Sequence, residues 1–183
     1  MVSSKREKES PRTWRMALII ITSATILAIN LITPMAIPPP INPYHIRLTD
    51  VFSASISLID PFAGACGSVL GHFLYDLFTL GLPGAIPSLF AAWCYYLYGR
   101  IVKYRGKITA GRIILGMIIC ILWLSVELSL GFSLIFSIPF LPLFLTTLVS
   151  ISVNVVIGNV ILLMLLPHIK HYINAELELR RFW

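Results

Sequence analysis

Long apolar stretches dominate this sequence and restrict it to folds that place those stretches in a lipid bilayer. The two clearest cover residues 16–32 and 143–166. A helix needs about 20 largely apolar residues to span the hydrocarbon layer. Of the 183 residues, 57% are hydrophobic and 12% charged, with a mean hydropathy of +0.87. A water-soluble core of this size cannot hide so much apolar surface, so we predict an all-α membrane protein.

The positions of the basic residues predict the topology. Of the 14 Lys and Arg residues, all but Arg47 fall within residues 5–15, 100–112 and 170–181. Lys and Arg concentrate on the cytoplasmic side of membrane proteins, so an even number of spans should separate successive clusters. This arrangement also argues against a nucleic-acid partner, despite the net charge of +6.

Proline, glycine and the basic clusters divide the chain into six predicted transmembrane helices. Residues 1–13 should form a cytoplasmic basic tail, residues 14–167 a single transmembrane domain, and residues 168–183 a cytoplasmic C-terminal tail. The helices are expected at residues 14–33, 46–59, 61–79, 88–103, 112–135 and 143–166. The predicted fold is a six-transmembrane-helix bundle with both termini cytoplasmic, in which Asp60 and Pro61 form a tight cytoplasmic turn.

Two further patterns concern packing and cofactors. Gly64, Gly67 and Gly71 follow each other at spacings of three and four, which lets a neighbouring helix approach closely. The three cysteines lie in apolar stretches without a CxxC pair, and the sequence has no phosphate-binding loop or metalloprotease motif. We therefore expect no metal or cofactor, and no ATP hydrolysis by this chain.

Ionisable side chains inside apolar segments are candidates for function, because a charge at membrane depth costs several kcal/mol unless it meets a partner or a cavity. Arg47 and Asp50 share a helix face at spacing i,i+3, and His72 and Asp76 do so at i,i+4. We expect them to line one outward-facing pocket with aromatic and amide groups of similar depth. The predicted binding residues are Arg47, Asp50, His72, Asp76, Trp93, Glu127, Asn154 and Asn159.

The segment HIRLTDVFSASISLIDPFAGACGSVLGHFLYDLFTLGLPGAI carries a recurring pattern. An Arg and an acidic residue open the second helix, a Pro with spaced glycines opens the third, and an acidic residue precedes a Gly-rich turn. In this pattern the chain resembles the substrate-binding S components of energy-coupling-factor (ECF) transporters. The most similar branch is the queuosine-precursor (QueT-type) branch.

The resemblance implies a plasma-membrane subunit without ATPase activity that captures a vitamin-like or deazapurine nutrient from outside. Its implied partners are a transmembrane coupling subunit and two cytoplasmic ATPase subunits, besides membrane lipid. Ala24 and Ala28 are similar to the AxxxA motif through which such subunits meet the coupling subunit. Asn159 stands where the family pattern has an acidic residue. Because the cobalamin branch is closely related, a corrinoid is an alternative substrate.

Two other functions stay open at this point. The chain is an intramembrane enzyme if His72 and Asp76 act as an acid–base or metal pair with Glu127 assisting. It is a structural or assembly protein if its buried charges only pair with each other, for example Arg47 with Asp50. The enzyme hypothesis predicts turnover by the isolated chain, and the structural hypothesis predicts no ligand.

Overall fold

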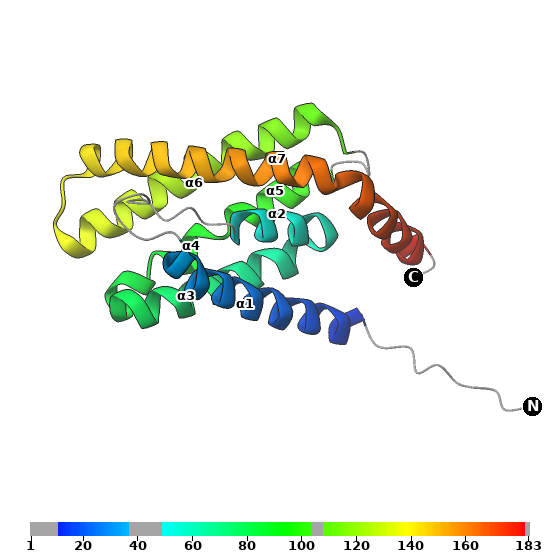
Figure 1. Ribbon diagram of the computed structural model, residues 1–183, viewed down its shortest axis with the longest axis horizontal. Coiled ribbons are helices and arrows are strands. Elements are labelled where there is room, and N and C mark those ends of the chain that lie inside the picture. The colour runs from blue at the N-terminus through cyan, green and yellow to red at the C-terminus, as the bar shows by residue number, and fades with distance from the viewer. Residues whose placement is uncertain (1–10, 37–48, 104–107, 182–183) are drawn as a thin grey trace, which may run out of the picture.

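A computed structural model describes residues 11–36, 49–103 and 108–181 of the chain, and the side chains of residues 12–32, 49–103 and 108–164. The described residues form helices and contain no strand, as the sequence predicts (Figure 1). The helices are α1 (Pro11–Ala36), α2 (Thr49–Ile59), α3 (Pro61–Ala85), α4 (Ser88–Ala91), α5 (Cys94–Val102), α6 (Ala110–Phe136) and α7 (Phe140–Arg181).

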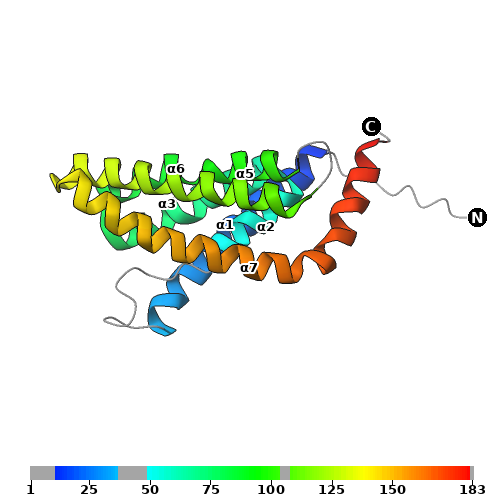
Figure 2. The same cartoon turned by 90° about the horizontal axis from the view of Figure 1, so that it is seen from above.

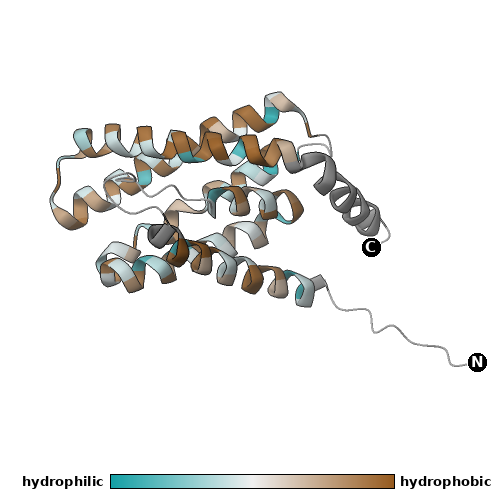
Figure 3. Ribbon diagram, viewed as in Figure 1, coloured by the Kyte–Doolittle hydropathy of each residue, from teal (hydrophilic) through white to brown (hydrophobic). Residues whose placement is uncertain are grey.

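Among the described residues, four helices are long and apolar enough to cross a membrane, which fits the predicted membrane protein. They comprise Arg12–Ile32, Pro61–Ala85, Ala110–Phe136 and Phe140–Met164. Apolar residues cover much of α1, α6 and α7 (Figure 3), and large ones such as Leu134 and Met164 are 82% and 72% exposed. Outward-facing apolar side chains of this kind are compatible with lipid and costly in water.

The second and fourth predicted helices differ from the long ones. The α2 helix has 11 described residues, so it is about 16 Å long, and residues 46–48 of the predicted helix lie outside the described residues. The predicted helix at 88–103 is wrong as a single element, because α4 ends at Ala91 and α5 begins at Cys94. At the interruption the Trp93 amide donates to the Phe90 carbonyl over 3.3 Å and the Tyr95 amide to the Ala92 carbonyl over 3.1 Å.

This interruption lies between helices, where freed backbone groups need partners in place of water. Local bonds from residue i to i+3 supply some of them. The Trp123 indole Nε1–H of α6 is a second donor to the Phe90 carbonyl, at 3.4 Å. Local bonds therefore close the turn, with one added contact from α6.

One predicted helix end is confirmed and one differs. The regular helix of α3 is interrupted at Gly81, close to the predicted end at residue 79, because a φ of 73° and a ψ of −179° are not helical and favour a residue without Cβ; a short helical segment then follows to Ala85. The α7 helix passes Pro167 and reaches Arg181, so the predicted end at residue 166 is wrong. Proline removes one backbone donor and kinks a helix without always ending it, and Figure 2 shows α7 bending towards its C-terminal end.

The glycine prediction is confirmed at the interface of α3 with α1 and α2. A Cβ atom added to Gly67 would lie 2.5 Å from the Thr22 Cβ, and one on Gly71 would lie 2.7 Å from the Ile26 Cβ. On Gly64 it would lie 2.6 Å from the backbone nitrogen of Ser57. Only hydrogen fits at these three positions, and α1 and α2 pack directly on the α3 backbone.

The turn between α2 and α3 forms as predicted and collects basic residues. Asp60 accepts from the backbone amides of Phe62 and Ala63, each over 3.0 Å, so it caps α3. Its Oδ2 also pairs with Arg15 Nε at 2.9 Å. Lys103 Nζ donates to the Ile59 carbonyl over 3.0 Å. Residues of the first two basic clusters thus meet at one end of the bundle.

Candidate functional site

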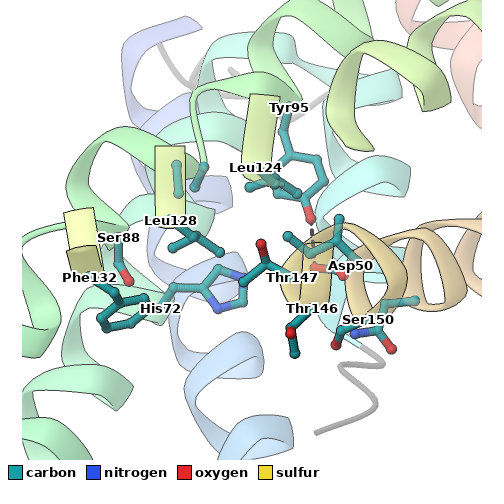
Figure 4. Close-up of a pocket in the computed structure, with 14 residues that line it drawn as sticks. Asp50, His72, Ser88, Tyr95, Leu124, Leu128, Phe132, Thr146, Thr147 and Ser150 are labelled. Atoms are coloured by element: carbon teal, nitrogen blue, oxygen red, sulfur yellow. Dashed lines mark hydrogen bonds between the residues drawn. The ribbon is translucent and has the colours of Figure 1, made fainter. Parts of the chain in front are cut away.

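A cavity of about 190 Å³ lies between the helices and is the candidate site (Figure 4). Its wall draws on α2, α3, α4, α5, α6 and α7, so it forms only when the bundle is assembled. His72 is 12 residues beyond Asp60 along α3, which places the cavity about 18 Å from the basic end. The lining residues are Asp50, His72, Ser88, Ala91, Ala92, Tyr95, Leu124, Leu128, Phe132, Thr146, Thr147, Ser150, Ile151 and Asn154.

Asp50 supplies the carboxylate of the cavity. It is buried in the first turn of α2, where the positive end of the helix dipole stabilises an anion. The Tyr95 hydroxyl of α5 donates to Asp50 Oδ1 over 2.6 Å (Figure 4). This charge-assisted bond fixes the carboxylate's orientation and ties α2 to α5 beside the cavity.

His72 supplies the imidazole from α3. The side chain is buried, and its Nδ1 lies 3.2 Å from Asn30 Nδ2 of α1. The Thr49 hydroxyl of α2 in turn donates to Asn30 Oδ1 over 3.3 Å. Asn30 was not among the predicted residues, although it is an isolated amide in the apolar run of α1.

The interrupted helix forms another part of the wall. Ser88 of α4 and the small side chains of Ala91 and Ala92 line the cavity next to the break. The Ser88 hydroxyl donates to Asp76 Oδ2 of α3. Asp76 is buried but does not line the cavity, so its contact with this space passes through Ser88.

The α7 wall contains polar residues that sequence reasoning missed. Thr146, Thr147 and Ser150 line the cavity together with the predicted Asn154. The Thr147 and Ser129 hydroxyls lie 2.5 Å apart, which joins α7 to α6. Spacings of three and four from Thr147 through Ser150 to Asn154 place them on one helix face, and that polar stripe in an apolar run was the available signal.

The structure therefore brings Asp50, His72 and Asn154 together at the cavity, with Asp76 behind Ser88. Asn159 does not line this cavity, and its Oδ1 accepts a hydrogen bond from the Tyr98 hydroxyl over 2.7 Å. A second void of about 10 Å³ separates this pair from Asp50 and Tyr95. Arg47 lies outside the described residues.

Trp93 and Glu127 do not line the cavity. Trp93 is 38% exposed and its ring packs against Phe62 at a centroid distance of 6.4 Å. Glu127 is half-buried on α6 between Trp123 and Gly131, both of which contact the segment 87–90. Its Oε2 atom is buried without a hydrogen-bond partner.

Two observations bear on the chemistry. Over the described ranges, no three His, Cys, Asp or Glu side chains gather in a geometry suited to a metal ion. The hydrogen bonds described above connect His72 to Asn30 and Asp76 to Ser88. The cavity thus combines a carboxylate, an imidazole, hydroxyls and an amide with apolar walls, which is a binding surface for a small polar molecule.

Comparison of the chain with protein-family models, with curated proteins and with solved structures finds no match.

Proposed function

We propose that this chain is the substrate-binding S component of an ECF-type importer in the plasma membrane, with six spans and both termini cytoplasmic. It captures a vitamin-like or deazapurine nutrient, such as a queuosine precursor, from outside the cell. The observation that carries the proposal is the polar-lined cavity inside an otherwise apolar bundle. Polar groups at membrane depth are expensive and are typically retained where they bind or transport something.

The interrupted helix supports the same proposal. Ala92 and Trp93 keep right-handed helical dihedral angles, with φ of −71° and −65°, so the interruption is a 3₁₀-like turn, and a short 3₁₀ stretch inside a helix often marks a functional hinge. Here the break between α4 and α5 adjoins Ala91 and Ala92, which line the cavity.

The cavity volume limits the size of the proposed substrate. An apolar cavity of roughly 150 Å³ holds one benzene molecule, so about 190 Å³ suits a compound of one or two fused rings. Phe132 offers an aromatic surface, and Asp50 and Asn154 offer edge hydrogen bonds. A ring system of this size is favoured over a corrinoid.

The proposed partners are a transmembrane coupling subunit and two cytoplasmic ATPases, which would supply the energy for uptake. The side chains of Ala24 and Ala28 are exposed on α1, one turn apart on the same face. They leave room for a partner helix to approach closely.

The proposal is tested by purifying the protein in detergent and identifying co-purified small molecules by mass spectrometry. Ser150→Leu places an apolar side chain in the cavity wall. Ser152→Leu makes the same change two residues away, at a position that does not line the cavity and whose hydroxyl bonds to the Leu148 carbonyl. We expect wild type and Ser152→Leu to retain a heterocyclic compound that Ser150→Leu loses.

Two results contradict the proposal. Turnover of a lipid or peptide by the isolated chain would favour the enzyme hypothesis. A wild-type protein that carries no small molecule, and binds none from a panel of deazapurines and vitamins, would favour the structural hypothesis.

A further inference from the structure

Glu127 is a carboxyl group in the apolar part of α6 that the cavity does not use. It is the eighteenth residue of this 27-residue helix, so it lies about 25 Å from the first residue and about 13 Å from the last. The side chains of Trp123, Val126 and Leu130 beside it are exposed, and Glu127 itself is half-buried. Glu127 therefore lies at the boundary between the protein interior and the lipid.

The contacts on either side of Glu127 show which helix it faces. One turn earlier, the Trp123 indole Nε1–H donates to the Phe90 carbonyl over 3.4 Å. One turn later, a Cβ added to Gly131 would lie 2.7 Å from Pro87 Cγ. Residues at a spacing of four share a helix face, so Glu127 faces α4 between these two contacts.

The hydrogen-bond donors around Glu127 already have other acceptors. The backbone amides of residues 89–91 donate to carbonyls of residues 86 and 87, and the Trp123 indole donates to Phe90. Glu127 Oε2 is buried without a hydrogen-bond partner. Such an oxygen is costly on an ionised carboxylate and far less costly on a neutral carboxylic acid.

The helices packed against α6 are α3, α4, α5 and α7. Neither α4 nor the described side chains of α7 include a titratable group. From α3 come Asp76, bonded to Ser88, and His72, which lines the cavity. The α5 helix meets α6 at Cys120, two turns before Glu127, so its titratable side chains face an earlier part of α6. Within the described chain, Glu127 thus has no compensating cation.

We propose that Glu127 is a proton-binding site at the junction of α4 and α6, where it is a neutral carboxylic acid whose loss of the proton loosens the junction. An anion at this depth would have to draw water or headgroups towards itself, and the contacts of α6 with α4 would separate. Both helices also line the cavity, so release of the proton would change the cavity wall. The inference goes beyond substrate capture and does not depend on it.

The protonation state is measured by NMR of the full-length protein in bilayers, with ¹³C at the glutamate Cδ and ¹⁵N at the tryptophan indole. Loss of signal in Glu127→Gln and in Trp123→Phe identifies the two residues. At neutral pH we expect the Glu127 Cδ at the chemical shift of a carboxylic acid. As the pH rises, this signal should move to the carboxylate position and the Trp123 Nε1 signal should move with the same midpoint.

Two controls separate the junction from a general effect of pH. In Glu127→Gln the Trp123 signal should stay constant over the same range, because the amide cannot ionise. Trp14, near the start of α1, should stay constant in both proteins. A Glu127 carboxylate at neutral pH would overturn the proposed proton site and indicate a cation supplied by a partner. A Trp123 signal that ignores the ionisation of Glu127 would overturn the proposed loosening.

Dicyclohexylcarbodiimide, which dissolves in the bilayer, tests the same state without a variant. A neutral carboxylic acid adds across one C=N bond of this reagent: the proton goes to a nitrogen and the carboxyl oxygen bonds to the central carbon. The acyl group then migrates to a nitrogen, so the adduct keeps every atom of both reactants. We expect peptide mass mapping to find the adduct at Glu127, with labelling that is lost as the pH rises.

Asp60 is the internal control for this labelling, because its carboxylate pairs with Arg15 and caps α3 and should stay unmodified. An unmodified Glu127 would contradict a neutral acid at the lipid boundary. This result decides the matter even if Glu127→Gln fails to fold. None of these measurements needs a ligand, so a failure of this inference is distinguishable from a failure of the proposed function.

Discussion

Replacing Gly67 with alanine tests whether close packing of α1 on α3 holds the bundle together. The added Cβ would lie 2.5 Å from the Thr22 Cβ, 2.7 Å from the Thr22 Cγ2 and 3.1 Å from the Ile19 carbonyl oxygen. Thr22 is fully buried and, being β-branched, has few alternative rotamers in a helix. The two helices must therefore move apart.

The expected loss follows from two opposing terms. Overpacking a well-packed interface costs about 1–3 kcal/mol, and the backbone contact with Ile19 places Gly67→Ala at the upper end. Alanine regains about 1 kcal/mol of helix propensity over glycine. The net loss is about 2 kcal/mol, which lowers the unfolding midpoint by about 4–8 °C in a chain of this size.

Thermal unfolding in detergent, followed by far-UV circular dichroism, measures this shift. Gly111→Ala is the matched control, because a Cβ there meets nothing within 4 Å. Its midpoint should be unchanged or slightly raised. The double variant Thr22→Gly/Gly67→Ala should lose less stability than the sum of its single changes, because Thr22→Gly removes the two closest contacts. A Gly67→Ala midpoint at or above that of wild type would refute the packing argument.

Three further changes test other contacts. Asp60→Ala removes the cap of α3 and the Arg15 ion pair and should cost about 1–3 kcal/mol, whereas Asp60→Asn, which keeps the cap, should cost less; equal losses in chemical unfolding would contradict the capping role. Tyr98→Phe leaves the buried Asn159 oxygen without its donor and should cost about 1–3 kcal/mol, measured in the same way, and an unchanged midpoint would argue against this bond. Glu127→Gln removes the charge from a side chain with an unpartnered buried oxygen, so the thermal midpoint of this variant should be unchanged or higher. A marked drop in the midpoint would indicate a stabilising contact of the carboxylate.

The long helices and one turn follow from local sequence. Uninterrupted apolar runs predict the long helices α1, α6 and α7 because length and hydropathy suffice to identify a span. The turn at Asp60 is equally local, since an acidic cap followed by proline favours a helix start. The close contact at Gly67 was predictable because only glycine leaves so little bulk on a helix face.

Features that depend on tertiary contacts could not be predicted from the sequence. Nothing in Ala92 and Trp93 disfavours a continuous helix, and the Trp123 indole that contacts the Phe90 carbonyl at this turn comes from another helix. The spacing of His72 and Asp76 placed them on one face, but their hydrogen-bond partners, Asn30 among them, come from other helices. Trp93 and Glu127 were predicted only from their expected depth in the membrane. Whether a side chain reaches the cavity also depends on how its helix is rotated in the bundle.

The short α2 helix has a consequence for biogenesis. It is apolar on average, but its 11 described residues, which include Asp50, are too few to span the bilayer by themselves. The turn at Asp60 joins it to α3, which is apolar and long enough to span. We expect the two to leave the translocon as one helical hairpin, with α3 drawing α2 into the membrane and Asp50 carried to the protein interior before lipid can surround it.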